Sequence, residues 1–583
     1  MRTAPVDAEG TRVRIAESAA RVPKLGEHAP ALAVVAEDLL RASLVSPVPS
    51  AHRFQPPSAI ASLGMLLLEQ DNADNCEAFE RDVLDPYLGT EDALIDWRLL
   101  RLKGLLDRRT HRHWTREGWD WMAAAAESLD NQVPTGDNTE FAAGWLADKE
   151  SFQTDLLEAG VAVVDEGGVR ASALWAVYDL ANGRELSAAL DSTPSSGEME
   201  TAIEARLAEA AAEIGRPIVV FAFLDTGRSI RVMTVSSGSG RSGHLLGAAW
   251  EADRVATAAA VFTRAIEAIN PAAPDSIARR IGPWLDLLAS LGEAIGPCLV
   301  SDALVCFLPG RRLTSLPLHL MKLPGSRGEL LLSHPVLYAP NFAILLERGA
   351  EARRAERRGR ARLLVSVTKE RDGHAFRSRQ ALAARALTRR FGGMQFVKRL
   401  SGKRATPEAV LRALAKADEV LLLCHGAHIG RYRGYGLYLS DGRDLPPAVS
   451  VDVDVAPEVR RFTLAWDAFA GVAMSPAVIV SLACSSARTV VARAGVRVGP
   501  DAAAFAKGTR AIVAPLWNVD QDASLAWVDA FEAARSQASG KTVALWDAHR
   551  EASLRTREKF NHFFFWSALV LLGPIYGGIS HEK

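Results

Sequence analysis

Two short segments near the end of the chain constrain its fold more than any other feature. The runs Leu421 to Gly426 and Val478 to Ser486 each begin with several apolar residues and end in small or polar ones. Four or five apolar residues in a row, bounded by Gly or Ser, are typical of a strand covered on both faces of a parallel sheet. The first predicted strand ends at His425 and the second at Cys484. An imidazole and a thiol are therefore expected at two strand ends.

In open α/β sheets ligands bind at the carboxyl ends of the strands, so both groups would face one crevice. A thiol attacks as the thiolate, and its free pKa of about 8.5 leaves a few per cent ionised at neutral pH. Cys484 is the candidate nucleophile, and His425 would transfer a proton to the leaving amine. Gly426 has no Cβ, so its N–H can approach a carbonyl closely. We expect an oxyanion hole from the amides of Gly426 and Cys484, with the Ser485 amide also facing the crevice.

These residues also allow other interpretations. A buried cysteine is commonly a small hydrophobe and a lone histidine is commonly structural, but the pair at matched strand ends favours catalysis. Cys424, His425 and His428 could ligate a metal, yet no second cluster completes a tetrahedral zinc site, so no metal is expected. Three glycines match a dinucleotide-binding spacing without the continuing βαβ unit, which favours a turn and no cofactor: Gly238, Gly240 and Gly243.

Composition limits the class of protein. With 583 residues the chain exceeds a single core of roughly 250 to 300 residues, so two or three domains are expected. A net charge of −1 gives no general attraction to nucleic acid or to membranes. Met1 to Ala20 lacks an apolar signal core, and the longest apolar stretch, Phe563 to Pro574, is too short to cross a bilayer. Five cysteines without a framework spacing favour free thiols and a cytoplasmic location.

The pattern along the chain changes near residue 205. Residues 1–205 have mainly helical periodicity, for example over Ala31 to Ala42, and six tryptophans that either fill a core or form a partner-binding surface. We expect a mainly α-helical N-terminal domain that binds a regulatory partner. Strands and helices alternate over residues 216–576, which predicts an α/β domain with a mostly parallel sheet flanked by helices. A basic segment, Arg353 to Arg362, divides it into residues 216–350 and residues 362–576.

The predicted elements of this α/β part have specific bounds. Thr406 followed by Pro407 predicts a helix start, because the hydroxyl caps the helix and the proline fits its first turn. Helices are also predicted over Trp250 to Ile269, Ser276 to Ile295 and up to Arg389, and a hairpin over Gly436 to Leu445. Strands are predicted at Pro217 to Leu224, Ser229 to Val235, Ala303 to Leu308, Leu330 to Tyr338, Arg362 to Val367, Gln395 to Leu400, Glu419 to His425, Val478 to Cys484, Ala511 to Val519 and Phe565 to Leu572.

Several ordered blocks resemble the CHAT domain family, caspase-like cysteine peptidases related to separase. The resemblance covers roughly residues 216–576. The blocks are FLPGRRLTSLPLHLM (Phe307 to Met321), LLLCHGAHIG with His425, GLYLSDGRDL (Gly436 to Leu445), VIVSLACSSA with Cys484, FAKGTRAIVAPLWNVDQDAS (Phe505 to Ser524) and FFWSALVLLGP (Phe564 to Pro574).

The resemblance implies a caspase-like fold and hydrolysis of peptide bonds through a Cys-His dyad, here Cys484 and His425. It also implies a pocket for the P1 side chain near the strand after the nucleophile, for which Trp517, Asp520 and Asp522 are the candidates. Many members have Asp where this chain has Gln521, so specificity for Lys or Arg does not carry over directly. Asp520 and Asp522 could equally cap the next helix.

The resulting hypothesis is a cysteine endopeptidase that cleaves a protein target and is activated by a partner or ligand. The resemblance suits a bacterial defence or signalling setting, with a protein activator or adaptor acting through the N-terminal region. The alternative hypothesis is a catalytically silent caspase-like scaffold for protein interaction. Both reactive residues are present, which favours the enzyme.

Overall fold

The structure is a computed structural model, and two compact units make up the chain: Met1–Arg170 and Ala171–Lys583. No described helix combines the length and the apolar composition that crossing a membrane requires. The described residues are 56–70, 73–89, 96–130, 139–181, 196–237, 243–269, 273–277, 280–314, 316–326, 328–347, 362–368, 374–390, 398–428, 435–442, 463–465, 477–487, 490–491, 497–498, 504–505, 508–536 and 544–578.

The first unit is helical over its described residues, which confirms the prediction of a helical N-terminal region. Asp96 starts one of the helices, because its carboxylate accepts a hydrogen bond of 2.8 Å from the Arg98 amide. Apolar residues at helical spacing, such as Leu63 and Leu67 facing Leu102, form the core of this unit. Its elements are α3 (Pro56–Glu69), α4 (Ala73–Phe79), the π-helical turn η2 (Glu80–Leu84), α5 (Asp85–Leu88), α6 (Trp97–His111), α7 (Arg116–Asp130) and α8 (Thr139–Asp165).

Tryptophans of the first unit fill its core. Trp97, Trp114 and Trp119 are buried, and the guanidinium of Arg108 lies 4.9 Å from the ring centre of Trp114. These three residues therefore have the packing role that the sequence left open. The side chain of Trp145 and the predicted helix at residues 31–42 lie outside the described residues.

The second unit is built on one sheet of eleven strands, in the order β3-β2-β1-β4-β5-β16-β15-β12-β8-β6-β7. Neighbours pair in parallel except at β1–β2, β2–β3 and β15–β16. The strands are β1 (Ile218–Asp225), β2 (Ser229–Ser236), β3 (His244–Glu251), β4 (Leu304–Leu308), β5 (Val336–Tyr338), β6 (Arg362–Ser366), β7 (Lys398–Ser401), β8 (Glu419–Leu423), β12 (Val478–Ser481), β15 (Ala511–Pro515) and β16 (Leu569–Leu572).

The antiparallel pair β15–β16 divides the sheet into two parts. The first half-sheet contains β3, β2, β1, β4, β5 and β16, and the second half-sheet contains β15, β12, β8, β6 and β7. The carboxyl ends of the parallel strands therefore lie at opposite edges in the two halves. Small additional sheets join β9 (His425–His428), β10 (Tyr435–Tyr438) and β11 (Thr463–Ala465), and separately β13 (Val490–Val491) and β14 (Arg497–Val498).

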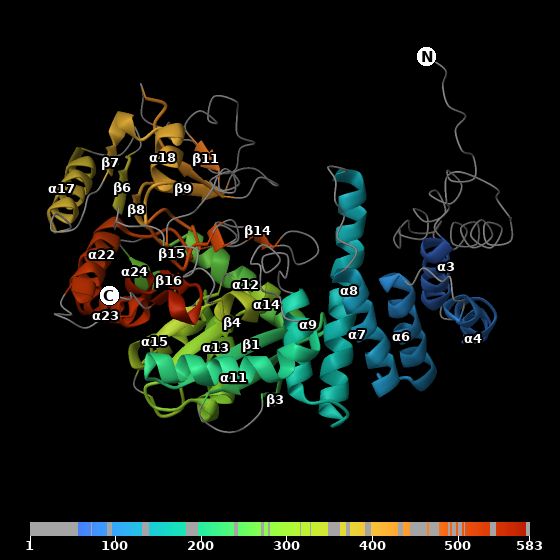
Figure 1. Cartoon of the computed structure of the whole chain (residues 1–583). Coiled ribbons are helices and arrows are strands. Elements are labelled where there is room, and N and C mark those ends of the chain that lie inside the picture. The colour runs from blue at the N-terminus through green and yellow to red at the C-terminus, as the bar shows by residue number, and fades with distance from the viewer. Residues whose placement is uncertain are drawn as a thin grey trace, which may run out of the picture. The chain divides into compact units, whose positions relative to one another are not determined.

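Helices cover both faces of the sheet (Figure 1). One face shares a core with α12, α13 and α18, to which alternate strand residues such as Val305 and Val365 contribute. The residues between them, such as Val220 and Leu421, are also buried, and α11, α22 and α23 lie along the sheet as well (Figure 1). The mostly parallel, doubly covered sheet confirms the predicted fold class. The helices are α9 (Leu174–Ala181), α11 (Ser196–Ile214), α12 (Ala252–Glu267), α13 (Gly282–Ile295), α14 (Gly310–Leu313), α15 (Leu330–Ser333), α16 (Phe342–Leu345), α17 (His374–Arg390), α18 (Pro407–Leu414), α22 (Gln521–Ser536), α23 (Leu545–Lys559) and α24 (Phe563–Trp566).

The boundary between the units lies at Arg170, earlier than the change of pattern at residue 205. Helix α9 belongs to the second unit because it anchors the sheet connections. The Asp179 carboxylate accepts hydrogen bonds from the amides of Phe342 and Ala343, at 2.7 and 2.8 Å, and so caps α16. The Tyr178 hydroxyl accepts one of 3.0 Å from the Gly310 amide. A segment that reads as helical in sequence is thus part of the α/β unit.

Several predicted elements hold and others need correction. β1 and β2 pair antiparallel as predicted, and the Thr406 hydroxyl caps α18 by accepting a hydrogen bond of 3.2 Å from the Ala409 amide. The predicted helix from Trp250 begins only at Ala252, because Trp250 lies in the edge strand β3, whose mostly apolar sequence does not alternate in the way that marks a strand. The predicted strand from Leu330 begins only at Val336, after a helical turn.

The predicted hairpin at Gly436 to Leu445 is wrong in its partner. β10 pairs antiparallel with β9, where Leu437 lies opposite Gly426, and with β11 on its other side. The turn signal of Asp441 and Gly442 suggested a return strand directly after it, but the partner strand lies elsewhere in the sequence. Residues 443–450 lie outside the described residues.

Candidate functional site

One pocket contains both reactive residues that the sequence singled out. His425 and Cys484 line the same open pocket at the carboxyl edge of the second half-sheet, which encloses about 510 Å³ when the solvent at its opening is included. The chain reaches this edge at the ends of β6, β8 and β12 and just beyond β15. The pocket is lined by Val367, Gln380, Leu423, Cys424, His425, Leu482, Cys484, Val519, Gln521, Ser524 and Leu525.

His425 is held where two sheets meet. β8 ends at Leu423, two residues earlier than predicted, and β9 begins at His425 and pairs with β10 in a separate small sheet. The change of sheet turns the chain at Cys424, so that His425 is the first residue after the turn and is half-buried. The backbone of His425 is thus held between two paired strands.

Cys484 lies in a tight turn rather than at the last position of a strand. β12 ends at Ser481, whose hydroxyl accepts a hydrogen bond of 3.3 Å from the Ala483 amide. Ser485 then adopts a left-handed conformation with φ 57°, which brings the chain sharply round. The Ser485 hydroxyl donates to the Asn518 side chain at 3.3 Å. These contacts keep the half-buried Cys484 at the mouth of the pocket.

The Ser485 amide does not face the crevice as expected. It donates a hydrogen bond of 3.2 Å to the carbonyl oxygen of Trp517, because the turn continues alongside the segment after β15. Its N–H is therefore engaged by backbone. The expectation for the amides of Gly426 and Cys484 stays a prediction.

Gln380 on α17 ties the strand ends of the pocket together. Its side-chain nitrogen donates to the carbonyl oxygens of Leu423 at 2.6 Å and Val367 at 3.2 Å, and lies 3.3 Å from the Ser366 hydroxyl. Leu423 ends β8 and Val367 follows β6, so one buried amide bridges both strands. Sequence reasoning missed this residue. The available signal was a polar side chain on the buried face of α17, in helical register with Ala384 and Leu387.

The second thiol in the pocket is unlike the first. Cys424 is buried, and desolvation together with the nearby Cys484 sulfur raises the pKa of its thiol to about 12. A thiol with this pKa is protonated at neutral pH and is a poor nucleophile. Of the two thiols, Cys484 is therefore the better candidate for attack.

The three candidates for the P1 pocket have other contacts. Trp517 is buried and its indole N–H donates to the Phe564 carbonyl oxygen at 3.1 Å. Asp520 caps α22, its carboxylate accepting a hydrogen bond of 3.0 Å from the Ala523 amide. Asp522 is exposed and pairs with Arg379 at 3.4 Å. None of the three is among the residues that line the pocket, whereas Gln521 is.

A metal site is not formed by the described residues. They contain no group of three or more His, Cys, Asp or Glu side chains that could hold an ion. The side chain of His428 and the glycine positions Gly238 and Gly240 lie outside the described residues.

A covered, mostly parallel sheet whose carboxyl edge carries a histidine and a cysteine in one pocket defines a caspase-like cysteine peptidase fold. Residues 288–574 match the model of the CHAT domain, and over this stretch the chain belongs to the CHAT domain family. No curated protein sequence matches the chain.

The solved structures that align with the chain have little sequence identity to it. Separase of Saccharomyces cerevisiae, in its complex with securin, aligns with a TM-score of 0.50 and 8% identity over 97% of this chain and 53% of that one. The chain thus spans about half the length of the separase chain. The RgpB gingipain of Porphyromonas gingivalis, solved with its pro-domain, aligns with a TM-score of 0.32 and 12% identity over 51% of this chain and 69% of that one.

Proposed function

We propose that the chain is a cysteine endopeptidase whose nucleophile is Cys484 and whose proton carrier is His425. The observation that supports the proposal best is that both side chains line one open pocket at the carboxyl edge of a caspase-like sheet. The pocket lies within the residues that match the CHAT domain. A protein substrate is the expected ligand, because a pocket that is open to solvent can accept a side chain of an extended polypeptide.

The proposed reaction has two steps. The Cys484 sulfur, after giving its proton to His425, attacks the carbonyl carbon of the scissile peptide bond. The C–N bond breaks as His425 returns that proton to the leaving amine, and a thioester with Cys484 remains. Water, activated by His425, then attacks the thioester and releases the carboxylate and the thiol. The amides of Gly426 and Cys484 would stabilise the negative oxygen in both steps.

Labelling with a peptidyl electrophile tests this proposal against the silent scaffold. Cys298 is the sharpest internal competitor, because its sulfur lies 3.9 Å from Nε2 of His244 and the residue is only partly buried. We expect alkylation at Cys484 in the wild type and in Cys298→Ala, and its loss in Cys484→Ala. Equal labelling of Cys298 and Cys484, or none at Cys484, would support the scaffold.

We also propose that residues 1–205 receive a protein activator or adaptor, in the cytoplasm and in a bacterial defence or signalling setting. The first unit has its own helical core, apart from the α/β unit. Separase, which has a similar fold, was solved in complex with securin, a protein partner. The rate of Cys484 labelling in the full chain should change when fractions of a cell lysate are added. A rate that stays constant across all fractions contradicts regulation by a partner.

A further inference from the structure

The side chains around Cys484 carry a pattern of charge that bears on which substrate the proposed peptidase would accept. None of the eleven described residues that line the pocket is Asp, Glu, Lys or Arg. Five are aliphatic, namely Val367, Leu423, Leu482, Val519 and Leu525. The walls are therefore apolar next to the proposed nucleophile.

The polar groups in the pocket are mostly already engaged. The Gln380 amide nitrogen donates to strand ends, and the Ser524 hydroxyl donates to the Asp520 carbonyl oxygen at 2.6 Å. Gln521 differs, since its side chain has no hydrogen bond to any described residue. Among the described residues that line the pocket, Gln521 therefore has the side-chain amide that is available to a ligand.

The described acidic side chains next to the pocket, Asp520 and Asp522, have their contacts outside it. Asp522 pairs with Arg379, and both side chains are more than half exposed, at 52% and 57%. The Asp520 carboxylate is used in capping α22. The amino end of α22, which points its partial positive charge toward the pocket, opposes a cation further. A Lys or Arg side chain entering here would lose water without meeting a carboxylate among the described lining residues, which is unfavourable.

The pocket wall formed by α22 is held from the far end of the helix. Arg535, near the carboxyl end of α22, pairs with Glu419 at 2.7 Å, and Glu419 pairs with Arg362 at 2.7 Å. Glu419 and Arg362 begin β8 and β6, so the helix is fixed to the amino ends of the strands whose carboxyl ends form the pocket. Gln521 therefore has a defined position.

From these observations we infer that the pocket binds an uncharged, mainly apolar P1 side chain, and that Gln521 is the residue that sets this specificity. The inference rests on the proposed peptidase function and narrows its substrate class. A Leu or Met side chain would contact the aliphatic walls, and the Gln521 amide would lie beside it without adding charge. Cleavage would occur after apolar residues rather than after Lys, Arg or Asp.

Fluorogenic peptides that differ only at P1 test the inference. For the wild type we expect kcat/KM for Leu or Met to exceed that for Arg or Asp by about tenfold or more. Gln521→Glu keeps the shape and adds a carboxylate, so it should raise the ratio of Arg to Leu cleavage by about tenfold or more. Glu in the first turn of a helix is favourable, so the variant should fold. Asp522→Asn, which alters a neighbour outside the pocket, is the matched control and should leave the ratio unchanged.

The outcomes separate the two proposals. Preference of the wild type for Lys, Arg or Asp, or an unchanged ratio in a cleaving Gln521→Glu enzyme, overturns the inference and leaves the peptidase intact. If no peptide is cleaved and no peptidyl electrophile labels Cys484 above the Cys484→Ala background, the peptidase proposal fails and the inference fails with it.

Discussion

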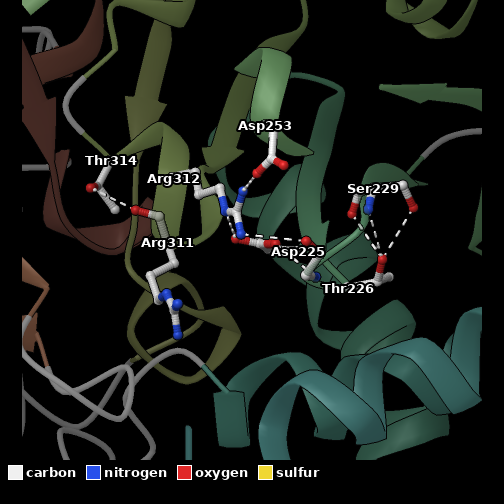
Figure 2. A network of polar contacts seen from close by, with 8 residues as sticks. Asp225, Thr226, Ser229, Asp253, Arg311, Arg312 and Thr314 are labelled. Atoms are coloured by element: carbon white, nitrogen blue, oxygen red, sulfur yellow. Dashed lines mark hydrogen bonds and ion pairs between the residues drawn. The ribbon is translucent and has the colours of Figure 1, made fainter. Parts of the chain in front are cut away.

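The two half-sheets differ in the side-chain contacts at the carboxyl ends of their strands. In the first half-sheet β1 ends at Asp225, and Arg312 pairs with this carboxylate at 3.0 Å and with Asp253 at 3.5 Å (Figure 2). In the second half-sheet the buried Gln380 joins the ends of β6 and β8 by neutral hydrogen bonds. One edge is closed by an ion pair and the other is bridged without charge.

Similar strands thus end in closely packed backbone in the first half-sheet and at an open pocket in the second. Gly310, just after β4, has φ 43°, and a Cβ there would collide with the carbonyl oxygen of Phe223, so the chain closes tightly over the strand ends. The second half-sheet leaves room at the corresponding edge, where a turn at Cys484 and a new strand at His425 replace the tight closure.

The cysteines of the two half-sheets differ in burial according to how far they lie from the end of a strand. Cys306 lies in the middle of β4, fully buried, and desolvation raises its pKa far above the ordinary value. Cys424 directly follows β8 and is buried, whereas Cys484 lies three residues beyond β12 and is only partly buried. Reactivity is expected to increase in that order as the thiol gains access to water.

The largest expected effect comes from replacing two thiols, one in each half-sheet, and the imidazole of His425, one at a time. Cys484→Ala should reduce peptide cleavage to background, and His425→Gln should reduce kcat by about 10²- to 10⁴-fold, because nucleophile and proton carrier are lost. Cys306→Ala, in the closed half-sheet, should leave kcat within about twofold, since a buried thiol of raised pKa takes no part. Cleavage assays with one substrate measure all three. Full activity in Cys484→Ala would assign the chemistry elsewhere.

The next test removes the ion pair that closes the first half-sheet. Arg312→Met leaves the largely buried Asp225 without its counter-charge and should lower the free energy of unfolding by about 3 kcal/mol. Because the change lies in the other half-sheet, kcat should change little at temperatures where the variant is folded. Urea unfolding and cleavage assays on the same preparation measure both. A large loss of kcat with unchanged stability would mean that the two edges are coupled through the sheet.

The order of elements and the placement of His425 and Cys484 near strand ends could be predicted from sequence because their signals are local. Apolar runs that stop at His425 and Cys484 mark strand ends without reference to any other part of the chain. The strand ends themselves were displaced by two or three residues, because the turn after β12 depends on Ser481 and Ser485 contacts that a hydrophobicity pattern does not encode.

Other parts of the site depend on contacts between distant segments. Gln380 acts on Leu423, which lies 43 residues away in sequence, and nothing in the local pattern of α17 specifies that partner. The same holds for α9, whose Asp179 caps a helix 163 residues away and so brings an apparently N-terminal helix into the α/β unit. Tertiary hydrogen bonds of this kind become visible only in the structure.

An effect of intermediate size on the pH dependence of stability is expected from a buried histidine beside β16, where the two half-sheets meet. Burial lowers the pKa of His549 to about 4, and its Nε2 donates to the Leu569 carbonyl oxygen on β16 at 3.0 Å. Below about pH 6.5 the unfolded chain takes up a proton that the folded chain refuses until about pH 4, so stability falls as the pH drops through this window. From pH 7 to pH 5 this residue alone should remove about 2 kcal/mol of stability.

His549→Gln removes this titration and provides the comparison. The variant should be less stable than the wild type at pH 7 but should lose less stability on going to pH 5, as measured by urea unfolding at both values. His319, buried beside Tyr338 with a pKa lowered to about 3, remains in both proteins and contributes equally to each. An identical pH dependence of the two proteins would show that His549 is not the titrating group.

The smallest effect is expected at Gln380, where the open half-sheet is bridged. Gln380→Met keeps the length of the side chain but leaves the carbonyl oxygens of Leu423 and Val367 without this donor, which should lower the free energy of unfolding by about 1 to 2 kcal/mol. Since Leu423 lies two residues before His425, kcat should fall several-fold with KM nearly unchanged. Leu382→Lys, at a 58% exposed position of the same helix, is the matched control and should change neither quantity. If Gln380→Met lowered stability alone, the amide would hold the strands without orienting the pocket, and the neutral bridge would be no more than the structural counterpart of Arg312.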